Sequence, residues 1–197
     1  MPDPLPVNAK LVFTSSLGLA GNFGGRTVAN MHCANAAAAA GLPGTFVAWL
    51  SGTERCGTTN CDFAARDAVT GTGPWYLLCR DENGRVRQPF LNRAALMVAP
   101  TTPLDCDERG RKVSSRVWTG TGVGGGRERF AQCAGYSVST GNAPSWTATR
   151  DGYTSNGMYL SSSLTATVGS TSAIDERWTS AGGAECADTN RFYCFQL

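Results

Sequence analysis

The sequence contains one histidine, His32, and this scarcity limits the catalytic chemistry open to the chain. A Ser-His-Asp hydrolase needs a histidine as its base. His32 directly precedes Cys33 within a predicted helix, where an ordinary polar residue is the favoured interpretation. The serines and acidic residues therefore lack a recognisable base, and we expect neither enzyme activity nor a cofactor.

Long hydrophobic runs are also missing, and the charges are balanced. No apolar segment approaches the roughly 20 residues that span a bilayer, so membrane insertion is not expected. The 17 basic and 15 acidic residues give a net charge of +2. This balance disfavours nucleic acid and anionic membranes as partners. Residues 1–8 lack the apolar core of a signal peptide, and we expect a mature fragment with an added methionine.

Cysteine, in contrast, is present in an informative number. The chain has eight cysteines, and no two of them are spaced as Cys-x-x-Cys. Because structural zinc sites need closely spaced Cys and His ligands, four disulfides are favoured over zinc. Disulfides persist in oxidising compartments, so we expect an extracytoplasmic protein, whether secreted, on the cell surface or periplasmic. The cysteines are Cys33, Cys56, Cys61, Cys79, Cys106, Cys133, Cys186 and Cys194.

Length and composition predict one domain with many loops. The 197 residues include 24 glycines, and 42% of the chain is hydrophobic, enough for a substantial core. Residues 1–9, with prolines at positions 2, 4 and 6, are predicted to form an extended leader or linker. Residues 10–197 are predicted to form a single domain.

The clearest secondary-structure signals lie near the two ends of the chain. Leu11–Ser15 and Arg191–Gln196 are predicted strands, and Thr45–Leu50 is a predicted buried strand. Arg26–Ala40 is a predicted helix, because alanine has the highest helix propensity. The glycines and proline of Gly41–Gly44 end this helix. Pairing of the two terminal strands would close the domain on itself.

The middle of the chain gives weaker signals. The run 119–126 is rich in glycine and is interpreted as a flexible loop, because a dinucleotide fingerprint needs a strand before it and a helix after it. Glycine, serine and threonine loops dominate the second half. The remaining predicted elements are strands at 75–79, 96–99 and 113–119, a short helix at 62–69, a turn at 81–84 and a polar loop at 53–62.

Several stretches together resemble a bacterial domain family of exported surface proteins, described as endostatin-like, with a C-type-lectin-like fold. The resemblance covers the chain from about Lys10 to Leu197. It implies an α+β fold with short twisted antiparallel sheets, one main helix, long loops and disulfides. The matching residues are Leu11–Ser15, the alanine-rich helix with Cys33, Ala39–Ser51 (AAGLPGTFVAWLS), Val117–Gly120, Trp178, Cys186 and Arg191–Phe195.

The resemblance also implies a pattern of disulfides. In such folds the cysteine of the helix pairs with that of the last strand, and two further cysteines pair in a nested loop. Carried over to this chain, these bonds are Cys33–Cys194 and Cys133–Cys186. The four other cysteines are then expected to form the local bonds Cys56–Cys61 and Cys79–Cys106.

Calcium-dependent sugar binding of the C-type-lectin kind is not expected. Gln88–Phe90 resembles one calcium-binding triplet of such lectins but lacks the oxygen ligand at its third position, and Trp178–Ser180 lacks the ligands of the other. Asp105, Asp107 and Glu108 form a small acidic cluster that offers oxygen ligands. A solvated loop explains such a cluster more often than a calcium site does.

The aromatic residues of the long loop region are the candidate ligand-binding residues. Aromatic faces beside amides, hydroxyls and charges suit a glycan or the surface of an extracellular protein. We therefore expect an exported recognition or adhesion domain. Alternatives are the structural tip or capping domain of an oligomeric surface fibre, joined through the proline-rich start, and an enzyme with an unrecognised site. The candidate binding residues are Trp146, Arg150, Tyr153, Asn156 and Tyr159.

Overall fold

The two ends of the chain meet in one sheet. The computed structural model describes residues 4–21, 23–56, 59–128 and 165–197, with the backbone alone at 54–56 and 59–60. Strand β1 (Lys10–Thr14) pairs antiparallel with the last strand, β11 (Tyr193–Gln196), and Val12 lies opposite Phe195. The predicted pairing of the terminal strands is therefore confirmed.

This sheet has four strands in the order β3-β11-β1-β6. Strand β3 (Phe46–Ala48) lies antiparallel to β11, and the short β6 (Trp75–Tyr76) lies parallel to β1. Because successive side chains of a strand point to opposite sides of the sheet, each side of the sheet packs against a different core. Leu11 and Phe13 belong to one buried cluster and Val12 to the other.

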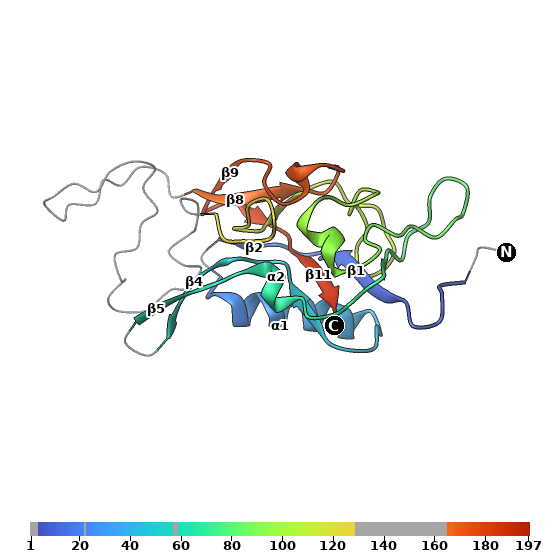
Figure 1. Ribbon diagram of the computed structural model, residues 1–197, viewed down its shortest axis with the longest axis horizontal. Helices are drawn as coiled ribbons and strands as arrows, with labels where there is room; N and C mark the ends of the chain where they lie inside the picture. The colour runs from blue at the N-terminus through green and yellow to red at the C-terminus, as the bar shows by residue number, and fades with distance from the viewer. Residues whose placement is uncertain (1–3, 22, 57–58, 129–164) are drawn as a thin grey trace, which may run out of the picture.

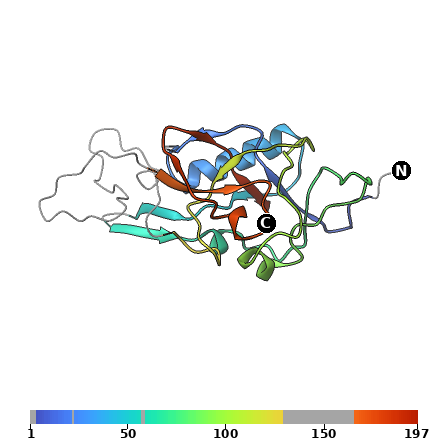
Figure 2. The same ribbon diagram turned by 90° about the horizontal axis from the view of Figure 1, so that it is seen from above.

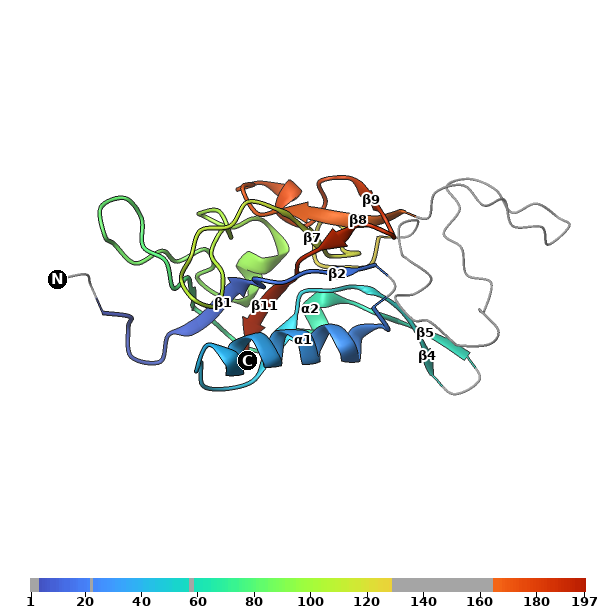
Figure 3. The ribbon, with the colours of Figure 1, turned by 180° about the vertical axis from the view of Figure 1, so that it is seen from behind.

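Helix α1 (Arg26–Ala39) covers the first face of the sheet (Figures 1 and 3). It buries Ala29, Cys33 and Ala37, which recur every four residues and so lie on one side of the helix. The helix ends as predicted, because Gly41 takes a left-handed conformation with φ of 69°. Ala48 at the sheet and Cys194 complete this core.

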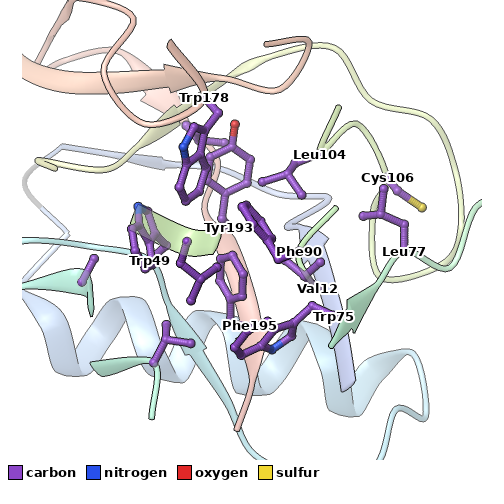
Figure 4. Packing of buried hydrophobic residues seen from close by; sticks show 14 of the residues in the cluster. Val12, Trp49, Trp75, Leu77, Phe90, Leu104, Cys106, Trp178, Tyr193 and Phe195 are labelled. Atoms are coloured by element: carbon purple, nitrogen blue, oxygen red, sulfur yellow. The ribbon is translucent and has the colours of Figure 1, made fainter. Parts of the chain in front are cut away.

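The opposite face of the sheet packs against aromatic side chains from distant parts of the chain (Figure 4). Trp178 contacts Trp49 and Phe90, with ring centroids 5.0 and 5.1 Å apart. Phe195 contacts Trp75 at 5.7 Å, with the two rings nearly perpendicular. All five side chains are fully buried, so this cluster provides much of the hydrophobic stabilisation.

Small sheets complete the fold around these two cores (Figures 1 and 2). Three strands pair in the order β7-β8-β9, two strands pair as β2 and β10, and β4 and β5 form a hairpin. The coarse prediction of an α+β fold with one main helix and small sheets is confirmed. The bounds are β2 Leu19–Ala20, β4 Gly52–Cys56, β5 Thr59–Phe63, α2 Ala65–Ala68, η1 Arg93–Met97, β7 Arg116–Trp118, β8 Thr165–Ser170, η3 Glu176–Trp178, β9 Gly183–Glu185 and β10 Thr189–Asn190.

Three sequence predictions were wrong in this middle region. The expected polar loop at 53–62 is the β4–β5 hairpin, which projects from the body and needs no apolar face. No strand forms at 96–99: Leu96 and Met97 end the 3₁₀ helix η1, because the Asn92 side chain accepts a hydrogen bond from the Ala95 amide and caps a turn there. The strand expected at 75–79 ends at Tyr76, since the Leu77 amide donates to the Arg87 carbonyl instead.

Two of the predicted disulfides are present. Cys33–Cys194 links α1 to β11 with its Cα atoms 5.4 Å apart, and Cys79–Cys106 joins two loops with a separation of 5.9 Å. Cys61 and Cys186 are also disulfide-bonded. The predicted pairs Cys56–Cys61 and Cys133–Cys186 each include one cysteine whose side chain lies outside the described residues, so those pairings stay predictions.

The two observed disulfides should differ in their effect on stability. Their sequence separations are 161 and 27 residues, for which the chain-entropy model gives about 5 and about 3.5 kcal/mol. We expect Cys33→Ala/Cys194→Ala to lower the free energy of unfolding by about 1.5 kcal/mol more than Cys79→Ala/Cys106→Ala. Urea unfolding of both variants measures this. The reverse order would show that loop closure is not what these bonds contribute.

Gly169 in β8 is a second determinant of stability. A Cβ atom at this position would lie 1.9 Å from the carbonyl oxygen of Trp178. We expect Gly169→Ala to destabilise the protein by at least about 2 kcal/mol, because the backbone around η3 must move. Gly126 has open space around it and no left-handed φ, so Gly126→Ala is the matched control. Equal unfolding midpoints for the two variants would contradict this expectation.

Candidate functional site

The residues predicted to bind a ligand lie outside the described residues. They are Trp146, Arg150, Tyr153, Asn156 and Tyr159. The chain is described up to Glu128 and again from Thr165. The surroundings of these two residues therefore show where the candidate segment joins the body of the protein.

The first junction is tied to the β4–β5 hairpin. The guanidinium of Arg127 forms an ion pair with Asp62 at 3.1 Å and donates to the Thr53 hydroxyl at 3.3 Å. Thr53 in turn donates to the other carboxylate oxygen of Asp62 at 3.0 Å. The Glu128 amide donates to the Gly120 carbonyl at 2.9 Å. Side-chain and backbone bonds thus fix the chain beside the hairpin.

The second junction lies at the same end of the molecule. Strand β8 begins at Thr165, which pairs with Glu185 in β9. Figures 1 and 3 show the start of β8 and the strands β4 and β5 on the same side of the molecule. We call this region the hairpin end, defined by β4, β5, residues 119–128, the start of β8 and β9.

A buried polar network holds the base of the hairpin. Ser51, directly before β4, accepts a hydrogen bond from the Ala65 amide at 2.8 Å, and its hydroxyl lies 2.9 Å from that of Thr121. The Thr119 hydroxyl donates to the Thr179 carbonyl, and the Trp49 indole donates to the Thr179 hydroxyl at 2.9 Å. Because these polar groups are buried and satisfied, they give the hairpin base one specific geometry.

The acidic cluster considered for calcium is used in other interactions. Asp105 pairs with Lys112 and with the buried guanidinium of Arg87. Glu108 is buried and accepts the Ser16 amide at 2.9 Å. Within the described ranges, no group of three or more His, Cys, Asp or Glu side chains could hold a metal ion. The carboxylates of this cluster instead fix the loops around the Cys79–Cys106 bond.

Asp107, the third member of the cluster, accepts hydrogen bonds from its own turn. Its carboxylate binds the backbone amides of Arg109 and Arg111, each at 2.9 Å, and the Arg111 guanidinium. Burial alone would raise the pKa of this carboxyl and is the largest single effect. The amides of Arg111 and Arg109 and the Arg111 side chain together outweigh it, and they hold the pKa below the usual 3.8.

His32 and Tyr193 are titratable residues of a kind that catalytic sites use, but both pack against other side chains of the fold. The Nε2 atom of His32 lies 3.0 Å from the Leu17 carbonyl oxygen, and the ring packs on Phe192, as suits an ordinary polar helix residue. The Tyr193 hydroxyl is fully buried in the aromatic core. Burial raises the pKa of this hydroxyl well above 10.0, so Tyr193 stays protonated.

The aromatic side chains of the described body are not exposed at its surface. Trp49, Trp75, Trp118 and Trp178 are fully buried. Phe23 is half-buried, and every other described phenylalanine or tyrosine is buried. An exposed aromatic platform for a ligand would therefore have to come from elsewhere in the chain, where Trp146, Tyr153 and Tyr159 are found.

Sequence reasoning missed two features of this site. Arg87 is buried and donates to Asp105, Thr102 and the Pro103 carbonyl, yet nothing in its sequence neighbourhood separates it from the exposed arginines. The Ser51 network was missed as well. The one available signal was the position of Ser51 directly after the buried run Phe46–Leu50, where a hydroxyl has buried amides to bind.

Comparisons with known proteins give the chain no family. No model of a known protein family matches it, and a search of curated proteins finds no match either. Among the helices of the described residues, none is both long and apolar enough to cross a membrane. The observed disulfides are those of a protein that works outside the reducing cytoplasm.

The bonds of Asp107 predict a loss of stability in acid. The pKa of this carboxyl is lower in the folded than in the unfolded chain, so its contribution is present above about pH 4 and is lost as the pH falls through the folded pKa. We expect Asp107→Asn to weaken the fall in unfolding free energy on acidification below about pH 4. Denaturant titrations over this range measure the slope. Asp188→Asn, at an exposed position, is the control, and an equal slope in both variants would contradict the prediction.

Proposed function

We propose that this protein is an exported recognition or adhesion domain and not an enzyme. In this proposal the fold is a C-type-lectin-like scaffold, and loops at the hairpin end bind a glycan or an extracellular protein. The paired terminal strands and the helix-to-last-strand disulfide support the choice of scaffold. The bonding of the described His32 and of the acidic cluster within the fold favours binding over catalysis.

The observation that carries the proposal is the division of the aromatic residues. The described body uses its tryptophans in the core, so exposed aromatic recognition is left to the segment with Trp146, Tyr153 and Tyr159. Aromatic side chains provide much of the binding energy at many interfaces, because they bury a large area at low entropic cost. Both junctions of that segment lie at the hairpin end.

The rigidity of the scaffold supports the same function. Ser51 and Arg127 fix the hairpin base and the first junction, and Cys33–Cys194 fixes the helix to the sheet. A binding surface on a fixed frame loses less conformational entropy when a ligand binds. An oxidised and cross-linked frame is also suited to an environment without chaperones or reductants.

Binding assays with matched variants test the proposal. The intact oxidised protein is screened on a glycan array and on a panel of extracellular matrix proteins, which separates the two ligand classes. We expect Trp146→Ala and Tyr153→Ala to weaken the binding found by about 30-fold each, as hot-spot residues do. Val98→Ala, at a 70% exposed position directly after η1, is the control and should bind normally.

Two outcomes would overturn the proposal. Unchanged binding by Trp146→Ala and Tyr153→Ala would remove these residues from the site. No binding to either panel, together with a stable trimer in light scattering, would favour the structural tip or capping domain of a fibre. Equal melting temperatures of the variants are required, so that a loss of binding is not a loss of folding.

A further inference from the structure

In the exposed turn between β6 and η1, Asn83 is followed directly by Gly84. The turn is closed by hydrogen bonds from the Asp81 amide to the Arg85 carbonyl at 3.1 Å and from the Gly84 amide to the Asp81 carbonyl at 3.0 Å. The Asp81 carboxylate accepts the amides of Asn83 and Arg85. The Asn83 side chain is exposed and makes no hydrogen bond with the described residues.

We propose that Asn83 is a site of spontaneous deamidation. The Gly84 nitrogen attacks the side-chain carbonyl carbon of Asn83, and the N–H proton passes through solvent to the departing amide, which leaves as ammonia. A five-membered succinimide results. Water then adds to either of its two carbonyl groups, giving aspartate or, when the main chain is rerouted through the side chain, isoaspartate. No oxidant, metal or enzyme is required.

Gly84 is what makes this asparagine reactive. The attacking nitrogen belongs to the following residue, so a side chain there would crowd the ring as it closes, and glycine has none. The φ of Gly84 is +75°, and no atom lies within 4 Å of the position that a Cβ would occupy. The space beside the Gly84 Cα is therefore open, and no side chain stands there to crowd the closing ring.

The other asparagines of the described residues lack this combination. Each is followed by a residue with a side chain. The side-chain oxygens of Asn30 and Asn92 also accept backbone amides, at 2.9 and 3.1 Å, and Asn190 is buried. In the whole sequence, Asn156 is the second asparagine followed by glycine, and it lies outside the described residues.

The fold sets the rate and the consequence of the reaction. The Gly84 amide must first leave the Asp81 carbonyl, so the folded protein should react more slowly than the unfolded chain. The product adds a negative charge beside Asp81 and Glu82, and isoaspartate also lengthens the backbone within the turn. The damage should remain local, because Arg87 and the Cys79–Cys106 bond hold the base of this loop. Figures 1 and 3 show the loop, in green, on the side of the molecule away from the hairpin end.

Peptide mapping of aged protein tests the inference. The folded, oxidised protein is kept in mildly alkaline buffer at body temperature and then digested with trypsin. Cleavage after Arg80 and Arg85 isolates the peptide Asp81–Arg85, so Asn83 is read separately from Asn156. We expect OH to replace the side-chain NH₂ of Asn83, which raises the mass of this peptide and gives two chromatographic forms, aspartate and isoaspartate. The change should be faster than in peptides with the other described asparagines, because only Asn83 among them is followed by glycine.

Two variants complete the test. Asn83→Gln should remove the mass change from this peptide, because a longer side chain closes a larger ring far more slowly. Gly84→Ala should slow it as well, although the left-handed φ makes this variant strained, so Asn83→Gln is the deciding one. Conversion of Asn83 no faster than that of Asn30 or Asn92 would overturn the inference. The result does not depend on the proposed binding function.

Discussion

The pairing of β1 with β11 is the constraint on which the rest of the structure depends. These two strands come from opposite ends of the chain and form the centre of the main sheet. The chain between them must therefore start from this sheet and return to it. Such long-range pairing is entropically costly, and the Cys33–Cys194 bond offsets part of this cost by joining α1 to the same strand.

The same pairing separates the two cores and so determines which side chains remain for the surface. The small side chains that α1 buries, Ala29, Cys33 and Ala37, let the helix lie close to one face of the sheet. The opposite face gathers Trp49, Trp75 and Trp178 around Phe195. Each of these tryptophans also donates its indole N–H to an oxygen of the protein, to Thr179, Gln196 and Val98 respectively. Aromatic residues that are fully buried and satisfied in this way cannot also serve a ligand.

The sequence predicted the parts of the fold whose signals are local. The alanine run gave α1 and its glycine end, and the terminal apolar runs gave β1 and β11. The β4–β5 hairpin was missed because its strands project and carry polar residues, so the apolar alternation that marks a strand on a core is absent. The Ser51 network and the buried Arg87 depend on residues 70 and 18 positions away, as in the contacts with Thr121 and Asp105, and no local pattern encodes such partners.

The acidic cluster shows why residue type alone is a poor guide to function here. Asp105, Asp107 and Glu108 have the oxygen ligands that calcium needs, but each faces different protein donors: an arginine and a lysine, two turn amides with an arginine, and the Ser16 amide. A carboxylate that is already satisfied must lose those bonds before it can bind an ion, and the loops that it holds would be released. These three carboxylates thus stabilise the loops of the body. In the proposed binding function, the side chains that take part in recognition are those that the described body does not use, which is the physical reason to place the proposed binding surface at the hairpin end.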